Sequence, residues 1–330
     1  MIRNAQIAAS GMFVPERVIP NSFFNELLGE DVDTWLRENL TIKERRWCNE
    51  DQSTGDLCVE AANVILENAN TSARELDLII IATDTPEYIS PSTASVVQYR
   101  LGAVKAGTFD VNTACAGFVT ALDIASKYIR SDKKYNKVLV IGAYAMSKYL
   151  NMQDKKTVTL FADGAAGVLL RSIDNENEGF LTSSLYTEGQ YADWMGIYAG
   201  GTHQPVTPKV LENKDHLLKF VKKFPKETNP ITWTRMIKEA CDDIKINPKD
   251  INHYFITQIN INSIWETLDN LGVERSKGHT IMEYFGYTGS ACIPMAFDDA
   301  NRKGLIKKGD LVLFIGSGGG LAFALSIFKI

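Results

Sequence analysis

The chain has 330 residues, of which 45% are hydrophobic and 23% charged, and its formal net charge is −5. A chain of this size can bury one large core or two closely packed ones. The slight acidic excess provides no basic surface for nucleic acid, and the longest apolar runs, such as residues 78–82, have strand length and cannot span a membrane. The N-terminus turns polar too soon for a signal peptide, so we expect a cytoplasmic protein without membrane contact.

The five cysteines are widely spaced and odd in number. They form no Cys-x-x-Cys pair, and no histidine lies near them at the spacing typical of zinc sites. The sequence therefore predicts neither a disulfide framework nor a metal site. The cysteines are Cys48, Cys58, Cys115, Cys241 and Cys292.

Strand-like apolar runs alternate with amphipathic helical stretches, which indicates an α/β fold. The pattern occurs twice. Two buried strands end in threonine and are each followed by a helix ending in Leu-Gly, and further segments match in the same register. The matching pairs are 77–83 with 251–257, 113–116 with 288–291, and 137–143 with 310–317.

The duplication predicts two βα halves with a connection between them. We expect an N-terminal half at 1–175, a connecting and capping segment at 176–235, richer in Gly, Pro, Lys and Thr, and a C-terminal half at 236–330. Ligand sites in such folds lie where strand ends and helix starts converge. The residues predicted at these junctions are Cys115, Thr257, Tyr287 and Gly318–Gly320.

Cys115 lies between an extended, loop-like stretch at 106–111 and a helical pattern at 118–129. A thiol at a helix N-terminus is favoured as thiolate by the unpaired N–H groups and the helix dipole, and small neighbours leave room for a substrate carbonyl. This context predicts a nucleophile. The alternative is a buried cysteine that packs as a small hydrophobe.

Three other features allow two interpretations each. Asp84 and Glu87 follow a predicted strand, where either carboxylate would serve as a base or, as we favour, be solvated or cap a helix. Trp194 and Tyr198 would line a binding cavity or cover the core. Residues 217–224 are predicted to form a basic helix, which is either a docking site for an acidic partner or an ordinary solvated face.

A set of short motifs extends over nearly the whole chain. They are Trp35, Ile42–Arg46, Thr83–Tyr88 with Pro91-Ser92, Asp110–Phe118, Phe161–Gly167 and Gly318–Gly320. With these motifs the chain resembles the β-ketoacyl-acyl carrier protein synthase III family of thiolase-fold condensing enzymes. The resemblance implies two duplicated βα halves packed as α-β-α-β-α layers, and a homodimer.

The resemblance also implies roles for individual residues. Cys115 would take an acyl group from a thioester of coenzyme A or acyl carrier protein, with no permanently bound cofactor. The N–H groups of Cys115 and Gly319 would form an oxyanion hole. Trp35 would stack on the coenzyme A base, and Phe118 and Asn260 would contribute to substrate binding.

Two family residues are replaced in this chain. Thr257 occupies the position of a histidine in the run Ile256–Asn260, and Tyr287 that of an asparagine in the run Phe285–Gly289. In the family this pair holds the malonyl thioester oxygen as carbon dioxide leaves. Losing such an oxyanion donor and an acid–base group costs rate by about 10²-fold or more each. Both replacements keep a hydroxyl group.

These considerations predict an acyl-thioester transferase that forms an acyl-enzyme on Cys115 and passes the acyl group to a second substrate. The family default is a Claisen-type condensation in fatty-acid or polyketide biosynthesis, here in a specialised pathway. The alternatives are acyl transfer to an alcohol or amine without decarboxylation, and a catalytically weak partner subunit of a heterodimer.

Overall fold

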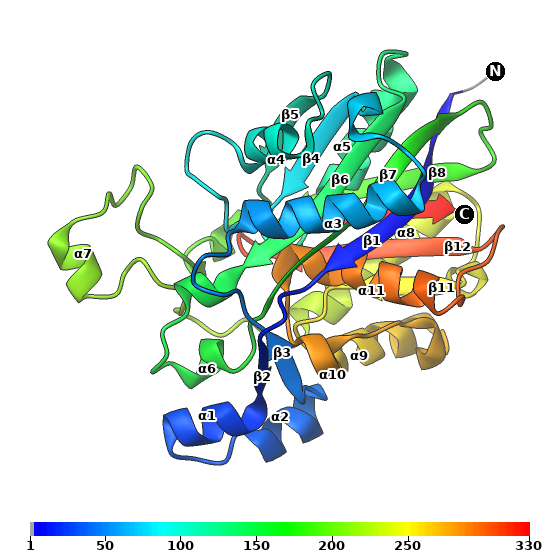
Figure 1. The fold of residues 1–330 in the computed structure, drawn as a ribbon. Helices are drawn as coiled ribbons and strands as arrows, with labels where there is room; N and C mark the ends of the chain where they lie inside the picture. Colours follow the sequence, from blue (N-terminus) through cyan, green and yellow to red (C-terminus); the bar gives the residue numbers. More distant parts are fainter. Residues whose placement is uncertain (1–2) are drawn as a thin grey trace.

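The apolar run at residues 78–82 forms strand β4 (Leu78–Ala82), whose residues are all buried. Its side chains alternate between two cores: Ile79 and Ile81 face one, and Leu78, Ile80 and Ala82 face the other. A strand buried on both faces lies in the middle of a layered α/β fold. The computed structural model describes residues 3–330 and shows this layering (Figure 1).

The first sheet has the strand order β1-β7-β6-β4-β5. β4 is parallel to β5 and β6, whereas β7 is antiparallel to β1 and β6. The stretch that we expected to be loop-like before Cys115 is β5. The other strands of this sheet are β1 (Asn4–Phe13), β5 (Gly107–Val111), β6 (Lys137–Ala145) and β7 (Asp163–Ile173).

The second sheet repeats the first. Its order is β11-β12-β13-β8, with β11 parallel to β12 and the remaining pairs antiparallel. The same order and directions occur in β4-β6-β7-β1, which confirms the duplication expected from the sequence. The strands are β8 (Gly179–Thr187), β11 (His253–Ile256), β12 (Leu311–Gly318) and β13 (Ala322–Lys329).

Helices complete five layers (Figure 1). One pair covers the outer face of the first sheet, a second pair lies between the sheets, and a third covers the outer face of the second sheet. The layered α-β-α-β-α arrangement is confirmed. The pairs are α3 (Thr54–Asn68) with α4 (Thr93–Leu101), α5 (Gly117–Ser131) with α11 (Cys292–Arg302), and α8 (Thr228–Asp243) with α9 (Ile261–Leu271).

The expected connecting segment is too long. Residues 179–187 form β8, which pairs with β13, and residues 228–243 form α8, which packs on the second sheet. Both belong to the second half because their apolar side chains fill its cores. The connection between the halves is therefore the short segment at residues 174–178 between β7 and β8, and residues 188–227 are an insertion within the second half.

Short elements surround the strand ends that carry the predicted site. The predicted basic helix at 217–224 is wrong, because backbone N–H groups there bind distant carbonyls instead of forming helical bonds: Leu218 N donates to Tyr149 O, and Val221 N to Trp194 O. The short elements are β2 (Val18–Pro20), α1 (Asn21–Leu28), α2 (Asp33–Leu40), β3 (Glu44–Arg46), α6 (Lys155–Val158), β9 (Met195–Gly196), α7 (Pro208–Glu212), β10 (Lys219–Phe220) and α10 (Met282–Phe285). Single 3₁₀ turns occupy Ala73–Glu75, Met146–Tyr149, Gly189–Tyr191, Pro248–Asp250, Arg275–Lys277 and Gly289–Ala291.

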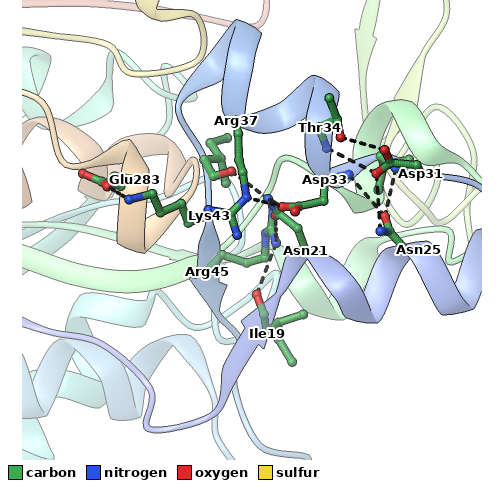
Figure 2. Close-up of polar contacts among 12 residues, drawn as sticks. Ile19, Asn21, Asn25, Asp31, Asp33, Thr34, Arg37, Lys43, Arg45 and Glu283 are labelled. Carbon is green, nitrogen blue, oxygen red and sulfur yellow. Dashed lines mark hydrogen bonds and ion pairs between the residues drawn. The ribbon is translucent and has the colours of Figure 1, made fainter.

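A buried arginine fixes the pair α1 and α2 to the body of the protein (Figure 2). The Arg45 guanidinium donates to Asn21 Oδ1 at 2.8 Å and to Thr159 O at 2.7 Å. Asn21 in turn donates to Asp33 Oδ1 at 2.7 Å, at the start of α2. Burial lowers the pKa of Arg45 to about 9. The network holds α2, which carries Trp35, over the site.

No helix within residues 3–330 is long and apolar enough to cross a membrane.

Candidate active site

Cys115 lies in a tight turn between β5 and α5, directly before the helix N-cap at Ala116. Asn112 Oδ1 accepts a hydrogen bond from Ala114 N at 3.0 Å, and Ala114 has a φ of 45°. A non-glycine residue in the left-handed region is strained, and such strain persists where the surroundings fix the turn. The position of Cys115 at a helix N-terminus is confirmed.

The surroundings that fix this turn are the end of β12. A Cβ atom on Gly318 would lie 2.4 Å from Thr113 O and 2.6 Å from Cys115 N, and one on Gly316 would lie 3.0 Å from Ala116 Cα. Only glycine permits this approach of two backbones. The second half of the chain is thereby in direct contact with the nucleophile turn of the first half.

The environment of the thiol is apolar, which opposes the predicted thiolate. Cys115 is 4% exposed. Burial raises the pKa of its thiol well above the usual value, and the charge of Asp84 raises it further, whereas a hydrogen bond with Tyr287 lowers it. Ionisation of Cys115 therefore depends on the groups around it, and its thiolate stays a prediction.

Tyr287 is the polar group that contacts the thiol. Its main chain is fixed by two hydrogen bonds, from Tyr287 N to Leu160 O and from Ala162 N to Tyr287 O, both 2.9 Å long. Its ring packs on Phe161 at 5.4 Å between centroids. Burial raises the pKa of the Tyr287 phenol well above its usual value, so the hydroxyl remains a donor at neutral pH.

Thr257, unlike Tyr287, does not line the cavities that contain Cys115. It is fully buried, and its Oγ1 accepts a hydrogen bond from Ser317 N at 2.9 Å. Its hydroxyl fixes the strand that carries Gly318, and a direct catalytic role for Thr257 stays a prediction.

Two polar side chains near Cys115 have unpaired atoms. Within residues 3–330, Asp84 Oδ1 and the Tyr144 hydroxyl are buried without a hydrogen-bond partner. Asp84 lines a cavity with Cys115 and does not cap a helix, contrary to the role that we favoured. Glu87 does have a structural role, since it accepts from Gly55 N at 2.7 Å and pairs with Arg100 at 3.0 Å. In the sequence, both unpaired groups are indicated by position: Asp84 follows β4 and Tyr144 lies near the end of β6. Ligand sites in such folds lie at these carboxyl ends of the strands.

Two cavities meet at Cys115. The larger, of about 590 Å³, is lined by Cys115, Tyr287 and Gly319 together with Trp35 and Asn260. The smaller, of about 230 Å³, is lined by Cys115, Gly319 and Asp84, among others. Cys115 and Gly319 therefore lie together in both cavities, as the predicted oxyanion hole requires.

The larger cavity continues into a neighbouring one of about 650 Å³ beside Trp35, whose side chain is 55% exposed. Four lysines and one carboxylate, Asp31, line this region, so its lining has a net positive charge. Tyr198 lines the small cavity, whereas Trp194 packs against Tyr191 and Phe224. The lysines are Lys155, Lys156, Lys222 and Lys223.

Of the two remaining predicted residues, Asn260 lines a cavity and Phe118 does not. Asn260 lines the larger cavity, and its Oδ1 accepts from Asn262 N at 3.0 Å to cap α9. Phe118 is fully buried and packs on Phe314 at 6.3 Å between centroids, so it belongs to the core between the sheets and contacts neither cavity. The predicted contact of Phe118 with substrate is therefore not present.

Histidines do not line either cavity that contains Cys115. His253 pairs with Asp310 at 3.1 Å and His279 with Asp299 at 2.7 Å, both away from the thiol. Within residues 3–330, no cluster of three or more His, Cys, Asp or Glu side chains could hold a metal ion. Beside the thiol, the two cavities contain the side chains of Tyr287, Tyr198 and Asp84.

The layered duplicated fold with a cysteine turn at the sheet junction defines a thiolase-fold protein. The structure is similar to 3-oxoacyl-[acyl-carrier-protein] synthase III from Aquifex aeolicus VF5, with a TM-score of 0.89, 29% identity, and 99% and 100% of the two chains covered. It is also similar to the priming β-ketosynthase of the R1128 polyketide pathway, with a TM-score of 0.87, 24% identity, and 99% and 96% covered, a likeness of fold alone.

Sequence comparisons give the family. Residues 109–189 match the profile of 3-oxoacyl-[acyl-carrier-protein (ACP)] synthase III, and residues 241–330 match that of its C-terminal part. The β-ketoacyl-[acyl-carrier-protein] synthase III of Caldanaerobacter subterraneus is 35% identical, with 98% of this chain and 97% of that protein covered. That of Natranaerobius thermophilus is 34% identical, with 99% of each covered. The chain belongs to the 3-oxoacyl-[acyl-carrier-protein] synthase III family of condensing enzymes.

The close approach at Gly318 predicts that Gly318→Ala lowers the free energy of unfolding by about 1–3 kcal/mol, since no backbone atom nearby can move cheaply. Gly319→Ala is the matched control, because its Cβ would meet only Met195 O at 3.4 Å. Urea unfolding of both variants measures the difference. Equal stability of the two would contradict the contact between β12 and the cysteine turn.

The raised pKa of Asp84 in the folded protein makes the free energy of unfolding depend on pH. Burial raises the pKa of Asp84 from 3.8 to about 6, so the folded state binds more protons than the unfolded state between these values. Wild-type stability therefore falls as pH rises through this window, whereas Asp84→Asn avoids the loss. We expect the variant to be the more stable protein at pH 8 and the two to converge below pH 4, in thermal or urea unfolding. A less stable variant at pH 8 would show that the carboxylate has a stabilising partner.

Proposed function

We propose that the chain is an acyl-thioester transferase of the synthase III type, which loads an acyl group on Cys115 and passes it to a second substrate. The observation that carries the proposal is the position of Cys115 between two cavities, next to Gly319 and the Tyr287 hydroxyl. One cavity is available for the acyl group and the other for the arm of the incoming thioester. The names of the relatives support a carrier-protein or coenzyme A thioester as substrate.

In the acylation step the Cys115 sulfur attacks the thioester carbonyl. A new S–C bond forms, the bond between the carbonyl carbon and the donor's sulfur breaks, and the proton of Cys115 leaves with the departing thiol. The N–H groups of Cys115 and Gly319 would stabilise the oxyanion. The Tyr287 hydroxyl would stabilise the developing thiolate by donating to the sulfur.

For the second step we propose condensation with a malonyl-type acceptor as the family default. In that step the bond to carbon dioxide breaks and the released carbanion attacks the acyl carbonyl, which returns the thiolate of Cys115. Tyr287 is the group in the larger cavity that can donate to the malonyl thioester oxygen. The lysine-lined region beside Trp35 is suited to the phosphate groups of the substrate arm.

A second candidate is acyl transfer to an alcohol or amine without loss of carbon dioxide. It is favoured by one observation, the lack of any histidine in the lining of the two cavities at Cys115. An amine acceptor is already a nucleophile and needs no enolate stabilisation, so this site suffices for it chemically.

Exposure to acetyl-, octanoyl- and malonyl-coenzyme A, followed by intact-mass and peptide analysis, tests the first step. We expect one acyl adduct on the peptide that contains Cys115, and its loss in Cys115→Ala. Cys292→Ala is the matched control, because Cys292 is also buried close to Cys115 and should leave the adduct intact. No adduct with any donor would contradict the proposal and favour a non-catalytic partner subunit.

The replaced pair gives a test of the second step. Thr257 does not itself line the cavity, but the longer imidazole of Thr257→His together with Tyr287→Asn places the family's two residue types at these positions, so release of carbon dioxide from a malonyl thioester should rise by about 10²-fold or more over the wild-type rate. Thermal unfolding shows whether the double variant is folded, and Tyr287→Asn alone controls for the loss of the phenol. An unchanged rate in a folded double variant would show that the cavity no longer has the geometry for decarboxylation.

A further inference from the structure

The small cavity behind Cys115 has an unusually polar wall for the place where an acyl chain would lie. Its lining includes Asp84, Asn112 and Tyr198, with Met146, Leu218 and Gly320 on other sides. Asn112 Oδ1 accepts a hydrogen bond from Ala114 N. Polar groups placed in an otherwise apolar pocket usually orient a ligand and provide specificity.

Asp84 is the group that needs an explanation. Its Oδ1 is buried and, within residues 3–330, has no hydrogen-bond partner. A desolvated carboxylate without a partner is costly, and in folded proteins such groups are nearly always paired. A ligand that donates a hydrogen bond in the small cavity would supply the missing partner.

The loop around Asp84 does not depend on this carboxylate. Thr85 Oγ1 accepts from Ala145 N at 2.9 Å, and Thr85 N donates to Thr83 Oγ1 at 3.0 Å. Further along, Glu87 holds the start of α3 through Gly55 N. The neighbours of Asp84 therefore fix the loop, and the Asp84 side chain is left free to contact what enters the cavity.

The two cavities at Cys115 would hold different parts of the substrates, the larger one the thioester arm and the smaller one the acyl group. The larger one connects to the lysine-lined region beside Trp35, so it must admit the long arm of each incoming thioester. An acyl group left on Cys115 must leave this path open for the second substrate. The small cavity, of about 230 Å³, is the space that remains for it.

With the acyl group of the proposed acyl-enzyme in the small cavity, we propose that Asp84 selects short acyl chains that end in a hydrogen-bond donor, a hydroxyl or ammonium group, over plain alkyl chains. The inference rests on the proposed acyl-enzyme function. An ionised carboxylate only accepts hydrogen bonds, so its partner has to be a donor. Burial raises the pKa of Asp84 to about 6, so the group is mainly ionised at pH 8.

Three coenzyme A thioesters of equal length test the proposal: butyryl, 3-hydroxypropionyl and 3-aminopropionyl. Their acyl groups differ only in the terminal CH₃, OH or NH₃⁺ group. Rapid mixing at pH 8 and intact-mass analysis give the rate constant for adduct formation on Cys115. We expect the hydroxyl and ammonium donors to react about 10- to 100-fold faster than butyryl in wild type, the range set by one hydrogen bond to a charged group.

Variants of Asp84 test whether its carboxylate causes the preference for acyl groups that end in a hydrogen-bond donor. Asp84→Asn keeps an acceptor oxygen but no charge, so it should retain preference for the hydroxyl and lose preference for the ammonium group. Asp84→Leu should prefer butyryl. Glu87→Gln is the matched control, because Glu87 lies on the same loop, faces Arg100, and should leave all three ratios unchanged. Thermal unfolding confirms that each variant is folded.

Two results would overturn the proposal. One is a wild-type enzyme that forms adducts but reacts as fast with butyryl as with the other donors. The other is an Asp84→Asn variant in which the rate constant for adduct formation falls equally for all three thioesters. That result would assign the carboxylate to proton transfer at the thiol. Failure of all three thioesters to form any adduct would instead overturn the acyl-enzyme function itself, and the two failures are distinguishable by mass.

Discussion

The close contact between the glycines at the end of β12 and the turn at residues 113–116 is the constraint on which the site depends. A Cβ at Gly318 would lie 2.6 Å from Cys115 N, so the two backbones meet without side chains between them. This contact sets the left-handed conformation at Ala114, places Cys115 at the start of α5, and brings Gly319 to the same cavities. The second half of the duplicated fold thus builds the site of the first.

The thiol at this contact is in an unusual electrostatic setting for a nucleophile. Burial and the nearby Asp84 raise its pKa, and hydrogen bonds from the Tyr287 hydroxyl and from the backbone of Cys115 lower it. A neutral phenol stabilises a thiolate by one hydrogen bond, whereas an imidazolium would add a full charge. Reaction at Cys115 is therefore expected to depend on the thioester itself, which removes remaining water and delivers the leaving thiol that takes the proton.

Much of the fold follows from sequence pattern. The matching segments predicted a duplicated βα unit, because buried strands and Leu-Gly helix ends are local signals, and the two sheets share a strand order. The pattern failed at residues 217–224, where tertiary hydrogen bonds replace helical ones, and at β8, whose place is decided by pairing with the distant β13. Cys115, Gly319 and Tyr287 were predicted together. Residue spacing alone could not show that Thr257 faces a strand, that Phe118 faces the core, or that the surroundings of Cys115 are apolar.

We expect Cys115 to carry an acyl group in the small cavity while the larger cavity stays open. A crystal structure of the protein after reaction with 3-hydroxypropionyl-coenzyme A tests this arrangement. The expected result is an acyl group bonded to Cys115 Sγ, its carbonyl oxygen within hydrogen-bond distance of Gly319 N, and its terminal hydroxyl donating to Asp84. An unmodified Cys115, or an acyl chain that lies along the larger cavity toward Trp35, would contradict it.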